Sequence, residues 1–369
     1  MNRYAILMIP FVTASLVCLS CATFTPTSPG KEPTPDELNR LCNLKHDLPE
    51  FGGEFSSILA NLTTHYWDES GDWRGDFQGD ATCFAPMLLY AMWKDIGVQA
   101  LLSMADTTVD HEISLVNRFF IWPVPHMDLV IGFPSLAEAY KATGREHYLN
   151  LFILGVNAGS MLATYYPDYL IPFMYDRASV YGALSTMSFK AFELTGNDAY
   201  KKRGLAIINQ ADRECWSEGE GLYSFSRYPD WPQATMMMAC VAAYRTTRDK
   251  SYLNRCRRIV TSMDGSFWDY ERGGYFGHPG ATSKALSGNN ALAWAYLDLY
   301  EATGEKVYIE KARSILTWIL SQDLYDRQAG IIHHHWNRTS GRDKTFCTGC
   351  NFHTLCIIYR LNKISRMGI

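Results

Sequence analysis

Aspartate, histidine and tryptophan side chains gather in a few aromatic segments of this 369-residue chain. Asp128 and Asp176 stand in two such segments, shortly before apolar runs. Cleavage of a glycosidic bond needs one carboxyl that protonates the departing oxygen and a second carboxylate that attacks or activates water. We therefore interpret Asp128 and Asp176 as candidate catalytic carboxyls, and His278 as a candidate group for proton transfer.

The same segments hold side chains that suit sugar binding, because aromatic rings pack against the C–H face of a sugar and polar groups bond its hydroxyls. The candidate substrate-binding residues are Asp80, His126, Arg177, Asp230, Trp231, Gln233, Asn290, Trp336 and His353. Structural alternatives remain open. An Asp or Asn at the start of a helix often acts as its N-cap, which applies to several of these residues and to Asp128 and Asp176. Trp231 could be plain core packing.

Histidines and cysteines near the C-terminus raise the question of a metal. The run His333–His335 precedes Cys347, Cys350 and His353, and imidazole and thiolate are zinc ligands. The spacing matches no common zinc motif, and a strand-like run over 331–336 would alternate its histidines between two faces. In an exported protein the two cysteines could also oxidise. We predict no metal and no cofactor; the sequence also has no phosphate-binding glycine loop and no nucleophile elbow.

The elements that position these residues follow from an internal repeat. A turn that begins with Thr-Gly and has a Tyr four residues after the Gly recurs along the chain. In one copy an Arg replaces the Gly. Its second residue is Gly144, Gly196, Arg248 and Gly304, at intervals of 52, 52 and 56 residues. A degenerate copy ends at Gly97. Such a constant period indicates a repeat architecture.

Each repeat reads as a helical hairpin. Residues 234–244 are apolar almost all round, as in a fully buried helix, and 252–263 alternate apolar and polar residues at spacings of three and four. Five such hairpins are predicted, at about 82–118, 131–163, 179–214, 234–265 and 288–322, and single helices at 55–66 and 352–364 can pair as a sixth. The prediction is an all-α (α/α)6 toroid of six helical hairpins; an open solenoid would need polar capping repeats.

In such a toroid the short Thr-Gly turns occupy one rim and the long aromatic loops the other. The candidate residues all belong to the long loops or to the inner helix starts beside them, so function is expected at that rim. Six helix N-termini converge there, and their positive dipole ends would favour an anionic group such as a uronic acid carboxylate.

The N-terminus predicts export. Residues 1–21 combine a short basic start with an apolar run, as in a signal peptide, and their end resembles a bacterial lipobox that would lipidate Cys21. An ordinary cleaved signal peptide without a lipid is the alternative. Residues 22–36 read as a Thr/Pro-rich tether and 37–369 as the toroid domain. We expect a periplasmic or envelope protein, in contact with the membrane only through a lipid on Cys21. The net charge of −4 without a basic stripe argues against nucleic acid and leaves a carbohydrate as the expected partner.

At the level of motifs, the repeated turns and the toroid resemble the six-hairpin glycosidase superfamily. The segment Trp231-Pro232-Gln233-Ala234 and the later turn Gly273–Phe276 are similar to the N-acylglucosamine 2-epimerase family, in which a Glu stands where this chain has Thr235. The segment Pro125–Leu129, followed by Gly132-Phe133, is more loosely similar to the unsaturated glucuronyl hydrolases. The resemblance implies a carbohydrate-active protein.

Three functions follow as hypotheses. The first is a glycoside hydrolase that cleaves oligosaccharides, including ones that contain uronic acids, through Asp128 and Asp176. The second is a sugar 2-epimerase in which His278 or His353 transfers a proton. The third is a carbohydrate-binding envelope lipoprotein without catalytic activity. Export favours the hydrolase, because extracellular glycans are polymers to be cut.

Overall fold

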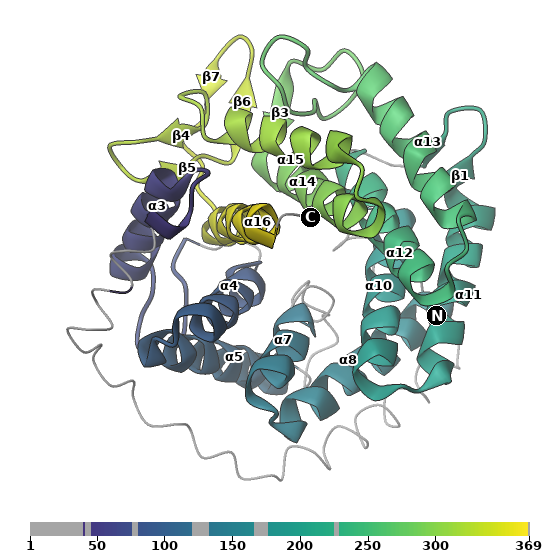
Figure 1. Ribbon diagram of the computed structural model, residues 1–369, viewed down its shortest axis with the longest axis horizontal. Coiled ribbons are helices and arrows are strands. Elements are labelled where there is room, and N and C mark those ends of the chain that lie inside the picture. Colours follow the sequence, from purple (N-terminus) through teal and green to yellow (C-terminus); the bar gives the residue numbers. More distant parts are fainter. Residues whose placement is uncertain are drawn as a thin grey trace.

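The computed structural model describes residues 40, 46–75, 80–119, 133–165, 176–224 and 229–367. Within them, twelve helices form two concentric layers around a central axis (Figure 1). The inner helices are α4 (Asp80–Ile96), α7 (Phe133–Thr143), α10 (Arg177–Thr195), α12 (Asp230–Thr247), α14 (Leu286–Thr303) and α16 (Thr348–Met367). The outer helices are α3 (Gly52–His65), α5 (Gln99–Phe119), α8 (Glu146–Tyr165), α11 (Asp198–Cys215), α13 (Ser251–Ser266) and α15 (Lys306–Ile319).

The inner helices form a closed ring. Each contacts its two inner neighbours, and α16 completes the ring by packing against α4. Each inner helix also contacts one outer helix, and the sixth such pair joins α3 and α16 from opposite ends of the sequence. The predicted (α/α)6 toroid is confirmed, and the predicted helix bounds differ from the observed ones by a few residues.

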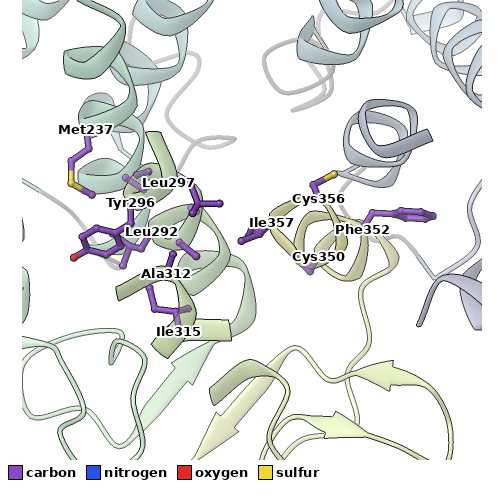
Figure 2. Close-up of a cluster of buried hydrophobic side chains, with 14 of the residues drawn as sticks. Met237, Leu292, Tyr296, Leu297, Ala312, Ile315, Cys350, Phe352, Cys356 and Ile357 are labelled. Atoms are coloured by element: carbon purple, nitrogen blue, oxygen red, sulfur yellow. The ribbon is translucent and has the colours of Figure 1, made fainter. Parts of the chain in front are cut away.

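The two layers differ in burial as their sequences predict. Eleven residues of α12 are buried, all round the helix, because it has neighbours on every side. Its outer partner α13 buries only Leu253, Cys256, Ile259 and Met263, which form one stripe. Between the layers the core is continuous: Figure 2 shows Leu292 and Tyr296 of α14 beside Ala312 and Ile315 of α15.

The short turns at one rim are alike in conformation. Gly97, Gly144, Gly196 and Gly304 each end an inner helix in the left-handed region, with φ between 68° and 72°. Glycine adopts this conformation without steric cost, and the amide of each residue caps the helix before it. Arg248 occupies the same position with φ of 63°, so the geometry of the turn persists where the glycine is missing.

The long loops of the opposite rim form small β-hairpins. Strand β1 (Trp216–Ser217) pairs with β2 (Leu222–Tyr223), and β4 (Tyr325–Asp326) pairs with β5 (Ile331–Ile332). The next sheet joins β3 (Ser283–Ala285), β6 (His335–Asn337) and β7 (Gly341–Arg342), all antiparallel. The predicted strand over 331–336 is therefore two strands, β5 and β6, which belong to different sheets.

A buried carboxamide near the start of an inner helix holds each of three hairpins. Its oxygen accepts a hydrogen bond from the backbone N–H of one hairpin residue, and its nitrogen donates to the carbonyl of that same residue. The pairs are Gln233 with Tyr223 (2.9 and 2.8 Å), Asn289 with Tyr275 (2.7 and 3.0 Å) and Asn351 with Ile332 (2.9 and 2.9 Å). These clamps attach the rim loops to the ring of helices.

The N-terminal predictions, including the signal peptide, the tether and the lipidated Cys21, lie outside the described residues. No helix among the described residues is both long enough and apolar enough to cross a membrane.

The clamps yield a stability prediction. Substitution Asn289→Ala leaves the buried N–H and C=O of Tyr275 without partners, so we expect it to lower the free energy of unfolding by about 2–4 kcal/mol. Asn254→Ala, on the exposed face of α13, serves as the control and should change it by less than about 0.5 kcal/mol. Urea denaturation measures both; equal effects would contradict the role of the clamp.

Candidate functional site

An axial cavity of about 800 Å³ lies inside the ring, and all six inner helices contribute to its lining. At the end toward the long loops its lining includes Cys83, Trp231, Thr235 and His353. At the end toward the short turns it includes the charged residues Glu138, Lys190, Glu193, Arg245, Asp298 and Arg360. We call the first end the rim end and the second the turn end.

Two predicted substrate-binding residues, Trp231 and His353, line this cavity. Trp231 is in the first turn of α12 and half-buried. His353 lies inside α16 rather than in a loop, and its ring stacks on Phe84 with centroids 4.0 Å apart. Burial lowers the pKa of His353 to about 3, so its imidazole is neutral at physiological pH and offers one donor and one acceptor.

Asp176 is the N-cap of α10, at the rim. Its Oδ1 accepts a hydrogen bond from the amide of Ser179 at 2.8 Å, while its Oδ2 is buried and has no hydrogen-bond partner among the described residues. The residue is 6% exposed, and this burial raises its pKa to about 6 despite the bond from Ser179. The capping alternative is thus correct for one oxygen of Asp176.

A second carboxyl, Asp230, lies at the start of the neighbouring helix α12. It is 2% exposed and accepts a hydrogen bond from the amide of Trp231 at 3.0 Å. Burial, with a smaller contribution from the charge of Asp176, raises its pKa to about 6. Gly288 of α14 makes room for this carboxyl, because a Cβ at that position would overlap Asp230 Oδ2.

Asp176 and Asp230 therefore form a coupled pair of rim carboxyls. Helix N-termini normally stabilise a carboxylate, yet here burial outweighs that effect. Two like charges near each other oppose their simultaneous ionisation, so the pair retains a proton at a pH where exposed aspartates have lost theirs. A carboxylic acid that is still protonated near pH 6 is able to act as a general acid.

Two other predicted binding residues belong to the scaffold. The amide of Gln233 is bonded to Tyr223 as described, and Asn290 donates to the carbonyl of Cys350 at 2.9 Å and accepts from the hydroxyl of Thr354 at 3.0 Å. Both side chains are fully buried. Their amides hold neighbouring segments together and are not available to a sugar.

Trp336 also differs from its predicted place at the pocket mouth. It is buried in β6, where it forms an aromatic cage with Phe276 and Trp318 around the ammonium group of Lys284. Lys284 is fully buried, and its Nζ lies 2.7 Å from Oδ2 of Asp269. Burial lowers the pKa of Lys284 to about 8, with Asp269 opposing the change. The sequence analysis missed this cluster, although a lysine within an aromatic loop is a visible signal.

Two more predicted residues, Arg177 and His278, are not among the described residues that line the cavity. Arg177 lies 3.5 Å from Glu214 of the outer helix α11. His278 is exposed, and its Nδ1 lies 3.1 Å from the carbonyl of Pro279. Asp80 is the first residue of α4, with a side chain outside the described set, and His126 and Asp128 lie outside it altogether.

The histidine run does not form a metal centre. No three His, Cys, Asp or Glu side chains of the described residues are arranged to hold a metal ion. His334 and His335 instead approach each other, with their Nδ1 atoms 3.0 Å apart. The described cysteines, including Cys347 and Cys350, are all buried.

Comparison with known proteins supports the resemblance seen in the sequence. A family model described as Glycosyl hydrolase family 76 matches residues 213–365. An alpha-mannanase of family 76 from Bacteroides thetaiotaomicron superposes with a TM-score of 0.63 at 11% identity, over 89% of this chain and 99% of the other. The chain has the fold of the six-hairpin glycosidase superfamily.

Other solved structures with this fold have different activities. The cellobiose 2-epimerase from Bacillus thermoamylovorans matches with a TM-score of 0.61 at 12% identity, over 90% of this chain and 100% of that one. An inactive alpha-1,6-mannanase variant from a Salegentibacter species was solved in complex with alpha-1,6-mannotriose. It matches with a TM-score of 0.62 at 10% identity, over 85% of this chain and 100% of that one. No curated protein sequence matches the chain.

The raised pKa of Asp176 leads to a pH-dependent prediction. The folded protein binds this proton with a pKa of about 6, whereas an unfolded aspartate has a pKa of about 3.9. The contribution of this group to the free energy of unfolding is therefore fully present below about pH 4, and it is lost as the pH rises through about 6. Asn keeps the cap oxygen but has no charge, so Asp176→Asn should raise the free energy of unfolding by about 1–3 kcal/mol at pH 7.5 and leave it unchanged at pH 4.

Thermal or urea denaturation of Asp176→Asn at both pH values measures this difference. Asp198→Asn is a matched control, because Asp198 is an exposed acid at the start of α11. It should not stabilise the protein at either pH. Destabilisation of Asp176→Asn at pH 7.5 would contradict the buried, high-pKa carboxyl.

Proposed function

We propose that this protein is a glycan-active enzyme and, within that class, a glycoside hydrolase that acts on oligosaccharides. The observation that carries the proposal is the buried carboxyl of Asp176 at the rim of a six-hairpin toroid, with a pKa raised to about 6 and an oxygen without a hydrogen-bond partner among the described residues. The match of residues 213–365 to a glycosyl hydrolase family supports it.

In this proposal Asp176 is the general acid that protonates the departing glycosidic oxygen. Asp230, at the start of the neighbouring helix α12, is a second buried carboxyl, and the charge of Asp176 raises its pKa. Asp128, which belongs to the segment before α7, is the proposed second carboxylate. Trp231, in the first turn of α12, offers an aromatic face for a sugar ring.

The arrangement of acids differs from that of one structural neighbour. The inactive Salegentibacter mannanase carries substitutions at two consecutive aspartates, whereas no two consecutive aspartates occur in this sequence. In the proposed hydrolase the two carboxyls, Asp128 and Asp176, come from separate segments of the chain. Mannose oligosaccharides are the first substrates to test, and oligosaccharides with uronic acids the second, since the inner helices direct their N-termini at the rim.

A sugar 2-epimerase is the second candidate. The neutral imidazole of His353 lines the cavity, and such a group is able to move a proton at a sugar carbon next to a carbonyl. The fold similarity to a cellobiose 2-epimerase agrees with this candidate. Thr235 weighs against it, because its hydroxyl is bonded to the carbonyl of Trp231 in a position where the resembling epimerases have a Glu.

The activity test is a reducing-sugar assay with proton NMR in D2O on the same samples. We expect new reducing ends, and a loss of at least a thousandfold in kcat for Asp176→Asn with oligosaccharide binding retained. Activity should fall above about pH 6, where the acid loses its proton. Asp198→Asn, the exposed control, should retain activity. Deuterium exchange at C2 without cleavage would favour the epimerase, and binding without turnover a non-catalytic lipoprotein.

We further propose that the protein works outside the cytoplasm, anchored in the cell envelope through a lipid on Cys21. The signal-like residues 1–21 and the Thr/Pro-rich segment 22–36 support this location. Cys21→Ser removes the acceptor thiol, so the protein should move from the membrane fraction to a soluble or unprocessed form. Wild-type protein in the soluble cytoplasmic fraction would contradict the proposal.

A further inference from the structure

The wall of the axial cavity is strongly apolar between its two ends. Phe84 and Met87 of α4, Met187 of α10, Met238 of α12 and Trp294 of α14 all line it. Methionine side chains adapt their shape to an apolar ligand. The lining of α12 extends from Trp231 to Arg245, which is roughly 20 Å along a helix.

Hydroxyl groups in the lining are already engaged. Thr186, Thr235 and Thr246 each donate their only hydroxyl hydrogen to a carbonyl one turn earlier in the same helix, at 2.9, 3.0 and 2.8 Å. These residues have no hydrogen left to donate to a ligand, and each carries a methyl group beside the bonded hydroxyl.

Charged groups at the turn end are paired with one another. The Nζ of Lys190 lies 3.2 Å from Oε1 of Glu138. The Oδ1 of Asp298 lies 2.6 Å from Nη2 of Arg360 and 3.9 Å from Nη1 of Arg245. Burial lowers the pKa of Lys190, whose side chain is 25% exposed. The turn end therefore presents neutralised ion pairs rather than an unpaired charge.

A buried sugar would fit this cavity poorly. Each sugar hydroxyl that leaves water needs a new hydrogen-bond partner, and an unpaired one is costly. A hydrocarbon chain needs none, and each of its methylene groups gains free energy on burial. Among the described lining groups, His353 at the rim end is a neutral polar group placed where a sugar would begin.

We propose that the axial cavity binds the hydrocarbon chain of a glycolipid, while its sugar lies at the rim beside Asp176. The sugar part of this proposal rests on the proposed glycan activity, and the chain part rests on the cavity alone. The occupant is thus an amphiphile with one apolar chain, which lies along the axis with its sugar at the rim end.

Isothermal titration calorimetry with octyl, decyl and dodecyl α-mannopyranoside, each below its micelle concentration, tests the chain part. Methyl α-mannopyranoside and dodecanoate are the reference ligands. We expect affinity to rise about fourfold per methylene group, and so about a hundredfold or more from octyl to dodecyl, with a negative heat-capacity change. Affinity independent of chain length would overturn the proposal. Dodecanoate binding as tightly as dodecyl mannoside would overturn the glycolipid as occupant.

Ala242→Phe places a ring in the cavity from α12 and should weaken dodecyl mannoside binding at least tenfold. Ala183→Leu fills the cavity from α10 with a smaller side chain, so it should weaken dodecyl mannoside binding less than Ala242→Phe does. Ala60→Phe, on the exposed face of α3, is the matched control and should bind as wild type. Circular dichroism verifies that each variant is folded. Unchanged binding in folded Ala242→Phe would overturn the proposal.

The two proposals fail separately. Asp176→Asn should keep the dependence on chain length while it loses turnover. If the chain length matters but no glycoside is cleaved, the hydrolase is wrong and the cavity assignment holds. If free oligosaccharides are cleaved and the chain length has no effect, the cavity assignment is wrong and the hydrolase holds.

Discussion

The closure of the inner ring is the constraint on which the rest of this structure depends. An inner helix that is apolar on every side is hidden only when it has an inner neighbour on each flank and an outer helix behind it. The last helix, α16, meets this requirement by packing against α4 and α3, the first helices of the ring. Asn362 of α16 reinforces the closure through hydrogen bonds with the backbone of Glu50 at 2.9 and 2.8 Å.

Ring closure also explains where chemistry is able to reside. All inner helices start at one rim, so carboxyls at successive helix starts become neighbours although they are far apart in sequence. Asp176 and Asp230 come together in this way, and the same packing withdraws them from water. Their raised pKa values are a consequence of burial that the helix termini only partly offset. Shifts of this kind are frequent at functional sites.

The axial cavity is a second consequence of the same geometry. Six helices around one axis leave space along it, and the nature of that space depends on the side chains that face inward. Here those side chains are mainly methionine and aromatic residues, with hydroxyls turned back to their own helices. The fold therefore permits many ligands, and the lining alone selects among them.

The sequence by itself determined the twelve helices, their pairing and the rim at which candidate residues gather. It could do so because the burial period and the turn glycines, such as Gly144, Gly196 and Gly304, are local properties. Only the tertiary structure decided what individual polar side chains do. Gln233 and Asn290 look like sugar ligands in the sequence, yet each amide is bonded to the backbone of another element, at Tyr223 of β2 and at Cys350 of α16. Trp336 closes a cage around Lys284, and Asp176 and Asp230 become acids of high pKa, because contacts between repeats set burial and no local pattern records them.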